Sequence, residues 1–117
     1  MPLDWEQGAL AVGLRCYRNR EFFDAHEHWE GEWLRAAEPE KTFLQALIQI
    51  AAAFHHFERK NVVGAASLLR ASLRKLELYP TAFGELDVDA IRQSVRAWLS
   101  ALGAGQPVPE LPFPKIR

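Results

Sequence analysis

The apolar residues of this chain recur with the period of an α-helix in every sizeable segment. Near the start, Leu10, Leu14 and Tyr17 follow one another at intervals of three or four residues, and later segments keep the same spacing. Such spacing places side chains on one face of a helix, whereas a half-buried strand needs strict alternation. The sequence has no run of alternating β-branched residues. We therefore expect an all-α fold with no sheet.

Capping side chains and prolines divide the chain into about five expected helices, packed as antiparallel pairs. Gln7 follows Asp4 by three residues, as in a capping box, so the first helix is expected to begin there. The other expected elements are a second helix over about residues 20–36, a third from Pro39 to about Arg59, a fourth capped by Asn61 and stopped by Pro80, and a fifth capped by Asp87 and ended by Gly103.

A faint internal repeat relates residues 20–25 to residues 60–65. Each segment has a polar capping position, an apolar pair and a small residue, and each precedes an amphipathic helix. Repeated helical pairs are typical of solenoids, but two units are too few for that class of fold.

Proline content sets a boundary near residue 103. Residues 1–103 are expected to form a single helical domain, and residues 104–117 an extended tail with proline at nearly every other position over part of its length. Proline is excluded from helix interiors, so polyproline II is the natural conformation of this tail. The apolar residues Val108, Leu111 and Phe113 fit a groove on the body or on a neighbouring subunit. The sequence does not decide between these arrangements and a loose tail.

The longest uncharged run, Thr42–Phe57, is apolar on nearly all sides of a helix. A helix of this kind belongs in the middle of a domain. The run is shorter than the roughly 20 apolar residues that a membrane span needs, and it contains two Gln and two His. We therefore expect a buried helix of a soluble protein here.

Composition excludes several classes of function. With 117 residues, 49% hydrophobic and 25% charged, the chain is the size of one globular domain. A net charge of −1 gives no basic field for nucleic acid or an anionic membrane, and we expect neither partner. Cys16 is the only cysteine, so no internal disulfide is expected. The start of the sequence lacks the pattern of a signal peptide, and a cytoplasmic location is expected.

Polar side chains interrupt the apolar pattern of the expected second helix. At about 100° per residue, His26, Glu30 and Trp33 fall within about 60° of one another. Glu27 lies at the edge of this stripe, and His28 lies roughly opposite and is expected to face solvent. Trp33 at this spacing is more typical of a core residue than of a ligand platform.

A second polar stripe lies on the expected third helix, where Gln45, Gln49 and His56 share one face. Helices joined by a short loop are antiparallel neighbours, so this stripe can face the His26 and Glu30 stripe. Buried polar groups without partners cost about 1–3 kcal/mol each, and a facing stripe would supply those partners. The sequence thus favours a polar seam between the second and third helices. The alternative is that the stripe of Gln45, Gln49 and His56 is the solvent-exposed face of its helix.

Three groups of residues together resemble the domain-of-unknown-function family 309. They are Phe23, His26, Glu27, Glu30 and Trp33; then Gln45, Gln49 and His56; then Asn61, Gly64, Ala65, Leu68 and Leu69. The resemblance covers about Tyr17 to Val88 and implies an all-helical domain. It implies no activity or substrate.

Three hypotheses of function remain open. The first is a small binding module with a polar pocket for a small ligand or a protein, formed by His26, Glu27, Glu30, Trp33, Gln45, Gln49 and His56. The second is a metal-dependent hydrolase, in which His26, Glu30 and His56 hold a divalent metal such as zinc. The third is a homo-oligomeric scaffold, a homodimer being the simplest form. The same polar pattern would also result if these residues only pair with one another and stabilise the fold.

Overall fold

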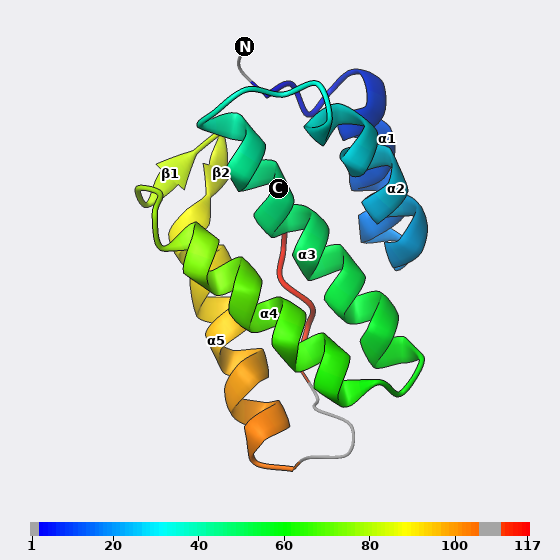
Figure 1. Cartoon of the computed structure of the whole chain (residues 1–117), viewed down its shortest axis with the longest axis vertical. Helices are drawn as coiled ribbons and strands as arrows, with labels where there is room; N and C mark the ends of the chain where they lie inside the picture. Colours follow the sequence, from blue (N-terminus) through cyan, green and yellow to red (C-terminus); the bar gives the residue numbers. More distant parts are fainter. Residues whose placement is uncertain (1–2, 106–110) are drawn as a thin grey trace.

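Five helices and one short hairpin make up the chain in the computed structural model, which describes residues 3–105 and 111–117. The helices are α1 (Gly8–Arg18), α2 (Phe22–Trp33), α3 (Glu40–Glu58), α4 (Val62–Leu76) and α5 (Val88–Gly103). Each helix packs against the next along the chain. Figure 1 shows α3 between α2 and α4, with α1 beside α2 and α5 beside α4. The expected all-α class is confirmed.

Helix α3 forms the centre of the core because it is apolar on nearly all sides. Phe43, Leu44, Leu47, Ile50 and Ala51 are fully covered. This burial follows from the uncharged run Thr42–Phe57 within the helix, which contacts α2 and α4. No helix in the described ranges is long and apolar enough to cross a membrane.

The first helix begins later than the capping pattern indicated. Asp4 accepts a hydrogen bond from the Glu6 backbone N–H at 3.0 Å, in a turn before the helix. The N-cap of α1 is Gln7, whose side chain makes no capping bond, and Gly8 has a φ of +62°. The expectation of a helix capped by Asp4 is wrong, since the Asp4 side chain serves this local turn instead.

The expected caps of the last two helices are confirmed. Asn61 accepts the Gly64 N–H and Asp87 accepts the Ala90 N–H, each at 3.0 Å. In both cases the side-chain oxygen satisfies an N–H that has no partner inside its helix. Buried Arg92 has a comparable role at the C-terminal end of α4, where it donates to the carbonyls of Leu76 at 2.8 Å and Tyr79 at 2.9 Å.

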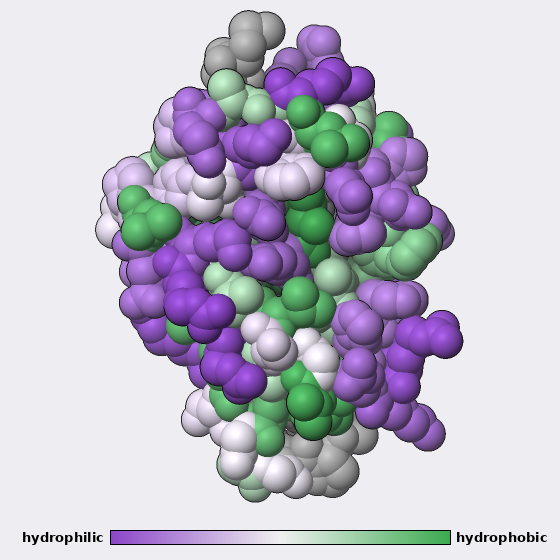
Figure 2. All heavy atoms as spheres, in the orientation of Figure 1, coloured by the Kyte–Doolittle hydropathy of each residue, from purple (hydrophilic) through white to green (hydrophobic). Residues whose placement is uncertain are grey.

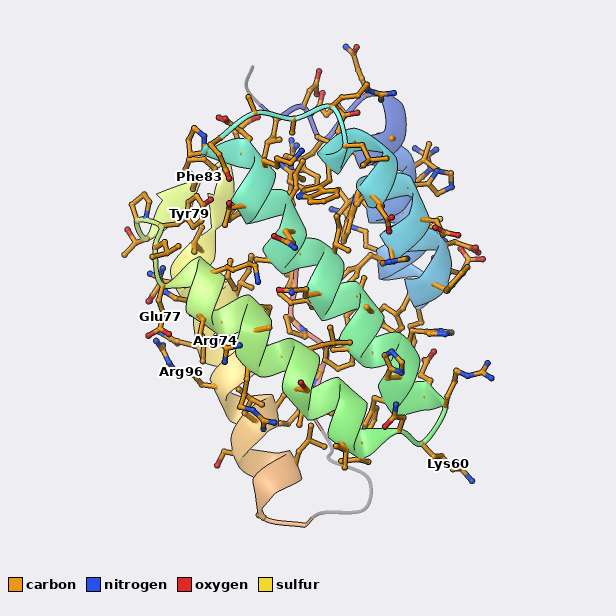
Figure 3. The ribbon with its side chains drawn as sticks, in the orientation of Figure 1. Lys60, Arg74, Glu77, Tyr79, Phe83 and Arg96 are labelled. Carbon is orange, nitrogen blue, oxygen red and sulfur yellow. The ribbon has the colours of Figure 1, made fainter. Side chains whose placement is uncertain are left out.

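The expectation of no sheet is wrong, because a short β-hairpin precedes α5. Strands β1 (Ala82–Phe83) and β2 (Leu86–Asp87) pair antiparallel. Gly84 and Glu85 form the turn with φ values of +57° and +64°, the two positive values that a tight two-residue hairpin requires. Strands this short carry no alternating pattern, so the periodicity of the sequence could not indicate them. Figure 3 shows Phe83 beside Tyr79, and their ring centroids are 4.8 Å apart.

The faint repeat in the sequence corresponds to two similar helical hairpins, α1–α2 and α3–α4. The turn of each has one residue with positive φ, Arg20 at +61° and Lys60 at +64°, at positions 40 residues apart. The same backbone hydrogen bond closes both turns at 2.8 Å, from Glu21 N–H to Cys16 O and from Asn61 N–H to His56 O. Positions 40 residues apart are therefore equivalent in the two turns.

The described part of the tail, residues 111–117, packs against the helical body. Ile116 is 1% exposed, and the Phe113 ring lies edge-on to Tyr17 and Phe22 at 5.2 and 5.3 Å. The Trp98 indole donates to the Pro112 carbonyl at 2.8 Å. Figure 1 shows this segment, in red, passing behind α3. The sequence left open whether the tail packs on its own chain, packs on a neighbouring subunit or is loose. In the structure, residues 111–117 pack on the helical body of their own chain. Val108 lies outside the described residues.

Candidate functional site

Helices α2, α3 and α4 surround a hollow of about 290 Å³. Five of the residues selected from the sequence line it: His26, Glu30 and Trp33 from α2, and Gln45 and Gln49 from α3. The remaining lining residues are apolar, namely Ile48, Ala52 and Leu68. In the view of Figure 2, hydrophobic side chains show along the middle of this face, between hydrophilic flanks.

The polar stripes of α2 and α3 thus border one hollow, with a mixed rather than wholly polar lining. The periodicity of the sequence located both stripes. It did not indicate that α4 would add Leu68, because that contact depends on how α3 and α4 cross. Leu68 was named only as part of the family resemblance, and no feature of the sequence linked it to this hollow.

Two of the selected residues, Glu27 and His56, do not line the hollow. The side chain of Glu27 is 56% exposed, and its Oε2 lies 4.0 Å from His26 Nδ1. The ring of His56 lies at the end of α3, where its Nδ1 is 3.1 Å from Asn61 Nδ2. The structure therefore does not bring together the proposed metal set of His26, Glu30 and His56. In the described ranges, the group that could hold a metal ion is His26, Glu27 and Glu30.

Asn61 explains the position of His56. One amide group contacts both neighbours, because Oδ1 accepts the Gly64 N–H while Nδ2 faces the imidazole. His56 Nδ1 then accepts this hydrogen bond, and His56 helps to fix the turn between α3 and α4. Its place in the sequence motif is consistent with this structural role.

We predict that Asn61→Ala lowers the free energy of unfolding by about 1 kcal/mol, since the Gly64 N–H loses its cap. Urea denaturation followed by circular dichroism measures the loss. Asn19, in the equivalent turn between α1 and α2, provides the control variant Asn19→Ala, because it caps α1 through its backbone N–H, which alanine retains. Equal losses for the two variants would contradict a specific role for the Asn61 cap.

Within the described residues, the one histidine–carboxylate contact on the lining of the hollow joins His26 to Glu30. His26 Nε2 is 3.1 Å from Glu30 Oε2, the geometry expected for positions four apart on a helix. Both side chains are partly exposed, so the pair adds little to stability by itself. Its effect on the site is to fix the orientation of the imidazole ring.

Three buried polar atoms of the lining side chains have no hydrogen-bond partner among the described residues. They are His26 Nδ1, Trp33 Nε1 and Gln49 Oε1. Buried polar groups are nearly always hydrogen-bonded in folded proteins, and each exception needs a specific explanation. All three atoms belong to residues around the same hollow. This concentration distinguishes the hollow from the rest of the described surface.

Lys41 holds the Trp33 indole in place at the end of α2. Its Nζ lies 4.6 Å from the centre of the Trp33 ring system and 3.3 Å from the Trp33 carbonyl oxygen. A cation over the indole face stabilises this position. It does not accept a hydrogen bond from the indole N–H, which points outward in the plane of the ring. The contact with Lys41 thus leaves Trp33 Nε1 without a hydrogen-bond partner among the described residues. By contrast, Trp29 is fully buried and donates to Leu10 O at 3.3 Å.

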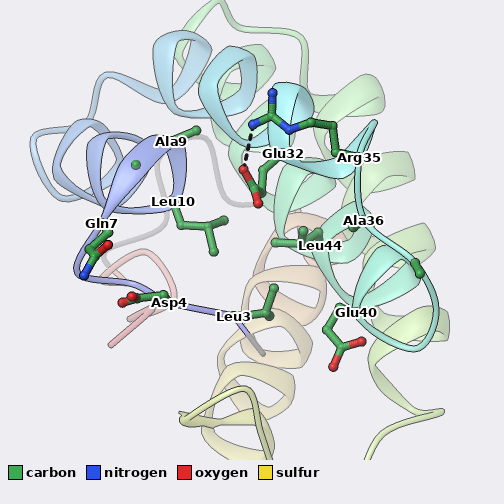
Figure 4. A pocket seen from close by; sticks show the side chains of 12 residues that line it. Leu3, Asp4, Gln7, Ala9, Leu10, Glu32, Arg35, Ala36, Glu40 and Leu44 are labelled. Carbon is green, nitrogen blue, oxygen red and sulfur yellow. Dashed lines mark hydrogen bonds and ion pairs between the residues drawn. The ribbon is translucent and has the colours of Figure 1, made fainter. Parts of the chain in front are cut away.

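A larger hollow of about 520 Å³ lies between the N-terminal segment and the loop that joins α2 to α3. Figure 4 shows Leu3, Leu10 and Leu44 around its centre, and the Glu32 carboxylate paired with Arg35 at 3.0 Å. Its charged groups are thus partly neutralised by one another. Periodicity did not indicate this hollow, since it depends on how the irregular N-terminal segment covers α2 and α3.

Cys16 is not activated as a nucleophile. Burial, together with the negative charges of Glu21 and Asp24, raises the pKa of its thiol above the ordinary value. The thiolate is the reactive form, so the raised pKa keeps this thiol unreactive near neutral pH. Cys16 is instead a partly buried residue that packs against the hydrophobic core.

Comparison with known proteins assigns a family but no activity. The chain matches the family described as "Domain of unknown function (DUF309)" over residues 10–68, about half of its length. The chain belongs to this family. The DUF309 segment starts and ends earlier than the resemblance near Tyr17 to Val88 indicated. It includes every residue that lines the 290 Å³ hollow.

The chain is also similar to the uncharacterized protein YpuF of Bacillus subtilis (strain 168). It is 31% identical over 77 residues, which is 65% of this chain and 44% of YpuF. This chain therefore spans less than half the length of that relative.

Proposed function

We propose that this protein is a small binding module, and that the hollow between α2, α3 and α4 binds a small uncharged polar molecule. One observation carries the proposal. Trp33 Nε1 on α2 and Gln49 Oε1 on α3 are buried and lack hydrogen-bond partners among the described residues, and both residues line the hollow. An unpaired donor and an unpaired acceptor on adjacent helices form a complementary set.

The chemistry of these atoms defines the class of ligand. An indole N–H only donates, and an amide oxygen only accepts. A matching molecule presents an acceptor to Trp33 and a donor to Gln49, as a carboxamide or a urea does. The two unmade bonds cost about 1–3 kcal/mol each in the free protein, and a ligand that forms them recovers this free energy on binding.

The size and surroundings of the hollow support a small ligand. At about 290 Å³ it is at the lower end of the range of roughly 300–1,000 Å³ found for small-molecule sites. Ile48, Ala52 and Leu68 offer an apolar surface beside the polar groups. Few polar groups on an otherwise apolar surface fix the orientation of a ligand and provide specificity. We place this activity in the cytoplasm, in keeping with a single cysteine and no internal disulfide.

Nuclear magnetic resonance of the indole N–H groups tests the proposal. We suggest titrating ¹⁵N-labelled protein with nicotinamide, benzamide and phenylurea, each of which joins an amide or urea to an apolar ring. The Trp33 signal, assigned from Trp33→Phe, is expected to shift with at least one probe, together with the Gln49 side-chain amide signals. The signals of Trp5, Trp29 and Trp98 are expected to stay in place, since those residues do not line the hollow.

Gln49→Leu separates binding from folding. This variant is expected to abolish the response of Trp33 while leaving the protein as stable as before or slightly more stable, because it removes an unpaired buried acceptor. Gln93→Leu is the matched control, since Gln93 is exposed on α5 and pairs with Asp89 at 2.9 Å. If none of the three probes shifts Trp33 selectively, or if Gln49→Leu binds as well as the parent, this binding function is excluded for the class of ligand proposed.

A further inference from the structure

Residues 111–117 lie against a row of four aromatic rings, one each from α1, α2, α3 and α5. The ring centroids are 5.4 Å apart from Tyr17 to Phe22 and 5.5 Å apart from Phe22 to Phe54. The row ends with Trp98, whose centroid is 4.9 Å from that of Phe54. Because each ring contacts the next, the helical body holds the row in place. We call these four side chains the tail-binding face.

Two of the rings donate hydrogen bonds to the main chain of the tail. The Trp98 indole donates to the Pro112 carbonyl at 2.8 Å, and the Tyr17 hydroxyl donates to the Pro114 carbonyl. Both side chains are buried, and each has a single donor. Because a buried donor without an acceptor is unfavourable, the face requires a segment that supplies carbonyl groups at alternate residues. An extended proline-containing segment does so, since its carbonyls make no internal hydrogen bonds.

The side chains that the tail inserts define what else the face recognises. Pro114 and Ile116 are buried, whereas Lys115 between them is exposed, an alternation typical of an extended chain. The Phe113 ring lies edge-on to the Phe22 ring at 5.3 Å. Recognition therefore involves the short pattern Phe-Pro-x-Ile, in which x is free to vary. Aromatic-lined surfaces bind proline-containing segments of other proteins in this way.

The tail neither fills its site nor matches its charge. A hollow of about 260 Å³ remains beside it, lined by Tyr17 and Arg18 of α1 and by five residues of the tail. Lys115 and Arg18, two cations, border this same hollow. Glu6, which pairs with Arg117 at 3.0 Å, does not line it. An acidic residue in place of Lys115 would therefore be electrostatically complementary to Arg18, whereas the lysine is not.

We propose that the tail-binding face is an interaction surface for a partner protein, which contributes an extended segment with Phe, Pro, an acidic residue and Ile in place of residues 113–116. The chain's own tail is the ligand that this segment displaces. Because the tail is attached to the body, it competes at a high effective concentration, so a partner needs an additional contact. The acidic residue supplies that contact at Arg18. None of the four rings lines the 290 Å³ hollow, so this surface is separate from the proposed ligand site.

Fluorescence anisotropy of labelled synthetic peptides tests the surface. One peptide repeats residues 111–117, and the second carries Lys115→Glu. The full chain with Ile116→Ala, whose tail has lost a buried side chain, is expected to bind both peptides saturably. The parent is expected to bind them at least about tenfold more weakly, because its intact tail competes. Ile116→Val is expected to lie between the two, and it takes the place of Ile116→Ala if circular dichroism shows that variant to be unfolded.

The same peptides test the charge of the partner segment. The glutamate peptide is expected to bind roughly threefold more tightly than the lysine peptide, the effect of one exposed ion pair. Combined with the tail variant, Arg18→Gln is expected to remove this preference. Arg15→Gln is the matched control and is expected to keep it, since Arg15 is exposed on the same helix but does not line the 260 Å³ hollow.

A third peptide, with both Phe113→Ala and Ile116→Ala, is expected not to bind. The proposal is overturned if neither of the first two peptides binds at millimolar concentration, if the third binds equally well, or if the parent and the tail variant bind alike. It is also overturned if sedimentation shows a dimer of the parent that the lysine peptide dissociates, because the tail of a second copy would then be the occupant. Equal loss of the preference in Arg15→Gln and Arg18→Gln would refute the acidic position.

Discussion

Ile116→Ala is expected to lower the free energy of unfolding by about 3 kcal/mol, within the range of roughly 2–5 kcal/mol for emptying a buried aliphatic site. Ile116 is 1% exposed and belongs to the same hydrophobic core as residues of the five helices. For a chain of this length, the melting temperature is expected to fall by about 12 °C, at roughly 4 °C per kcal/mol. Differential scanning calorimetry measures both quantities.

Leu111→Ala is the matched control for this prediction. Leu111 belongs to the same tail but is 37% exposed, so its loss is expected to cost less than about 1 kcal/mol. A small loss for Ile116→Ala, comparable with that for Leu111→Ala, would show that the tail is not part of the folded core in solution. We expect Ile116→Ala to cost clearly more than Leu111→Ala, because two hydrogen bonds also hold the tail on the body. The Pro112 carbonyl accepts from Trp98, and the Pro114 carbonyl accepts from Tyr17.

Gly13→Ala and Gly31→Ala are expected to change stability in opposite directions. Both glycines lie inside helices, where alanine is more stable than glycine by about 0.5–1 kcal/mol. The reason is that an unfolded chain with alanine loses less conformational entropy on folding than one with glycine. A Cβ at Gly31 meets no atom within 4 Å. A Cβ at Gly13 would come within 2.5 Å of Trp29 Cδ1 and 3.0 Å of Trp29 Cε2, and Trp29 is fully buried.

The Trp29 indole cannot yield easily, because it packs edge-on to Trp5 and donates to the Leu10 carbonyl at 3.3 Å. Overpacking of this kind costs about 1–3 kcal/mol, which exceeds the gain in helix propensity. Gly13→Ala is therefore expected to lower the free energy of unfolding and Gly31→Ala to raise it. Urea denaturation of the two variants decides the signs, and stabilisation by Gly13→Ala would contradict the close packing of α1 on Trp29.

The sequence predicted most of the helical framework, because local chemistry decides it. Apolar spacing indicated the five helices, and Asn61 and Asp87 cap α4 and α5 as expected from short-range hydrogen bonds. Local chemistry also misled at Asp4, where the same kind of bond closes a turn instead of a helix. The hairpin at Gly84 and Glu85 was missed, since strands of two residues carry no periodic signal.

The sequence predicted part of the candidate site. It indicated which helix faces carry the polar residues, but not which side chains contact one another. Helical angles placed His26, Glu30 and Trp33 on one stripe and Gln45 and Gln49 on another, and both stripes border the hollow. The same angles included His56, which the turn to α4 draws toward Asn61. A helical angle cannot anticipate this contact, because the partner lies on the far side of a turn.

By itself, the sequence determined the helical class, the central place of α3 and the α2 and α3 positions that carry polar groups. These features depend on residues three or four apart, and the period of the helix fixes their relations. Only the tertiary structure decided that Leu68 joins the hollow and that Ile116 enters the core. It also decided that Trp33 and Gln49 each keep a buried polar atom with no hydrogen-bond partner among the described residues. Those outcomes depend on how helices distant in the sequence cross and fill space. Packing therefore determines whether a polar stripe has partners of its own or is left to bind another molecule.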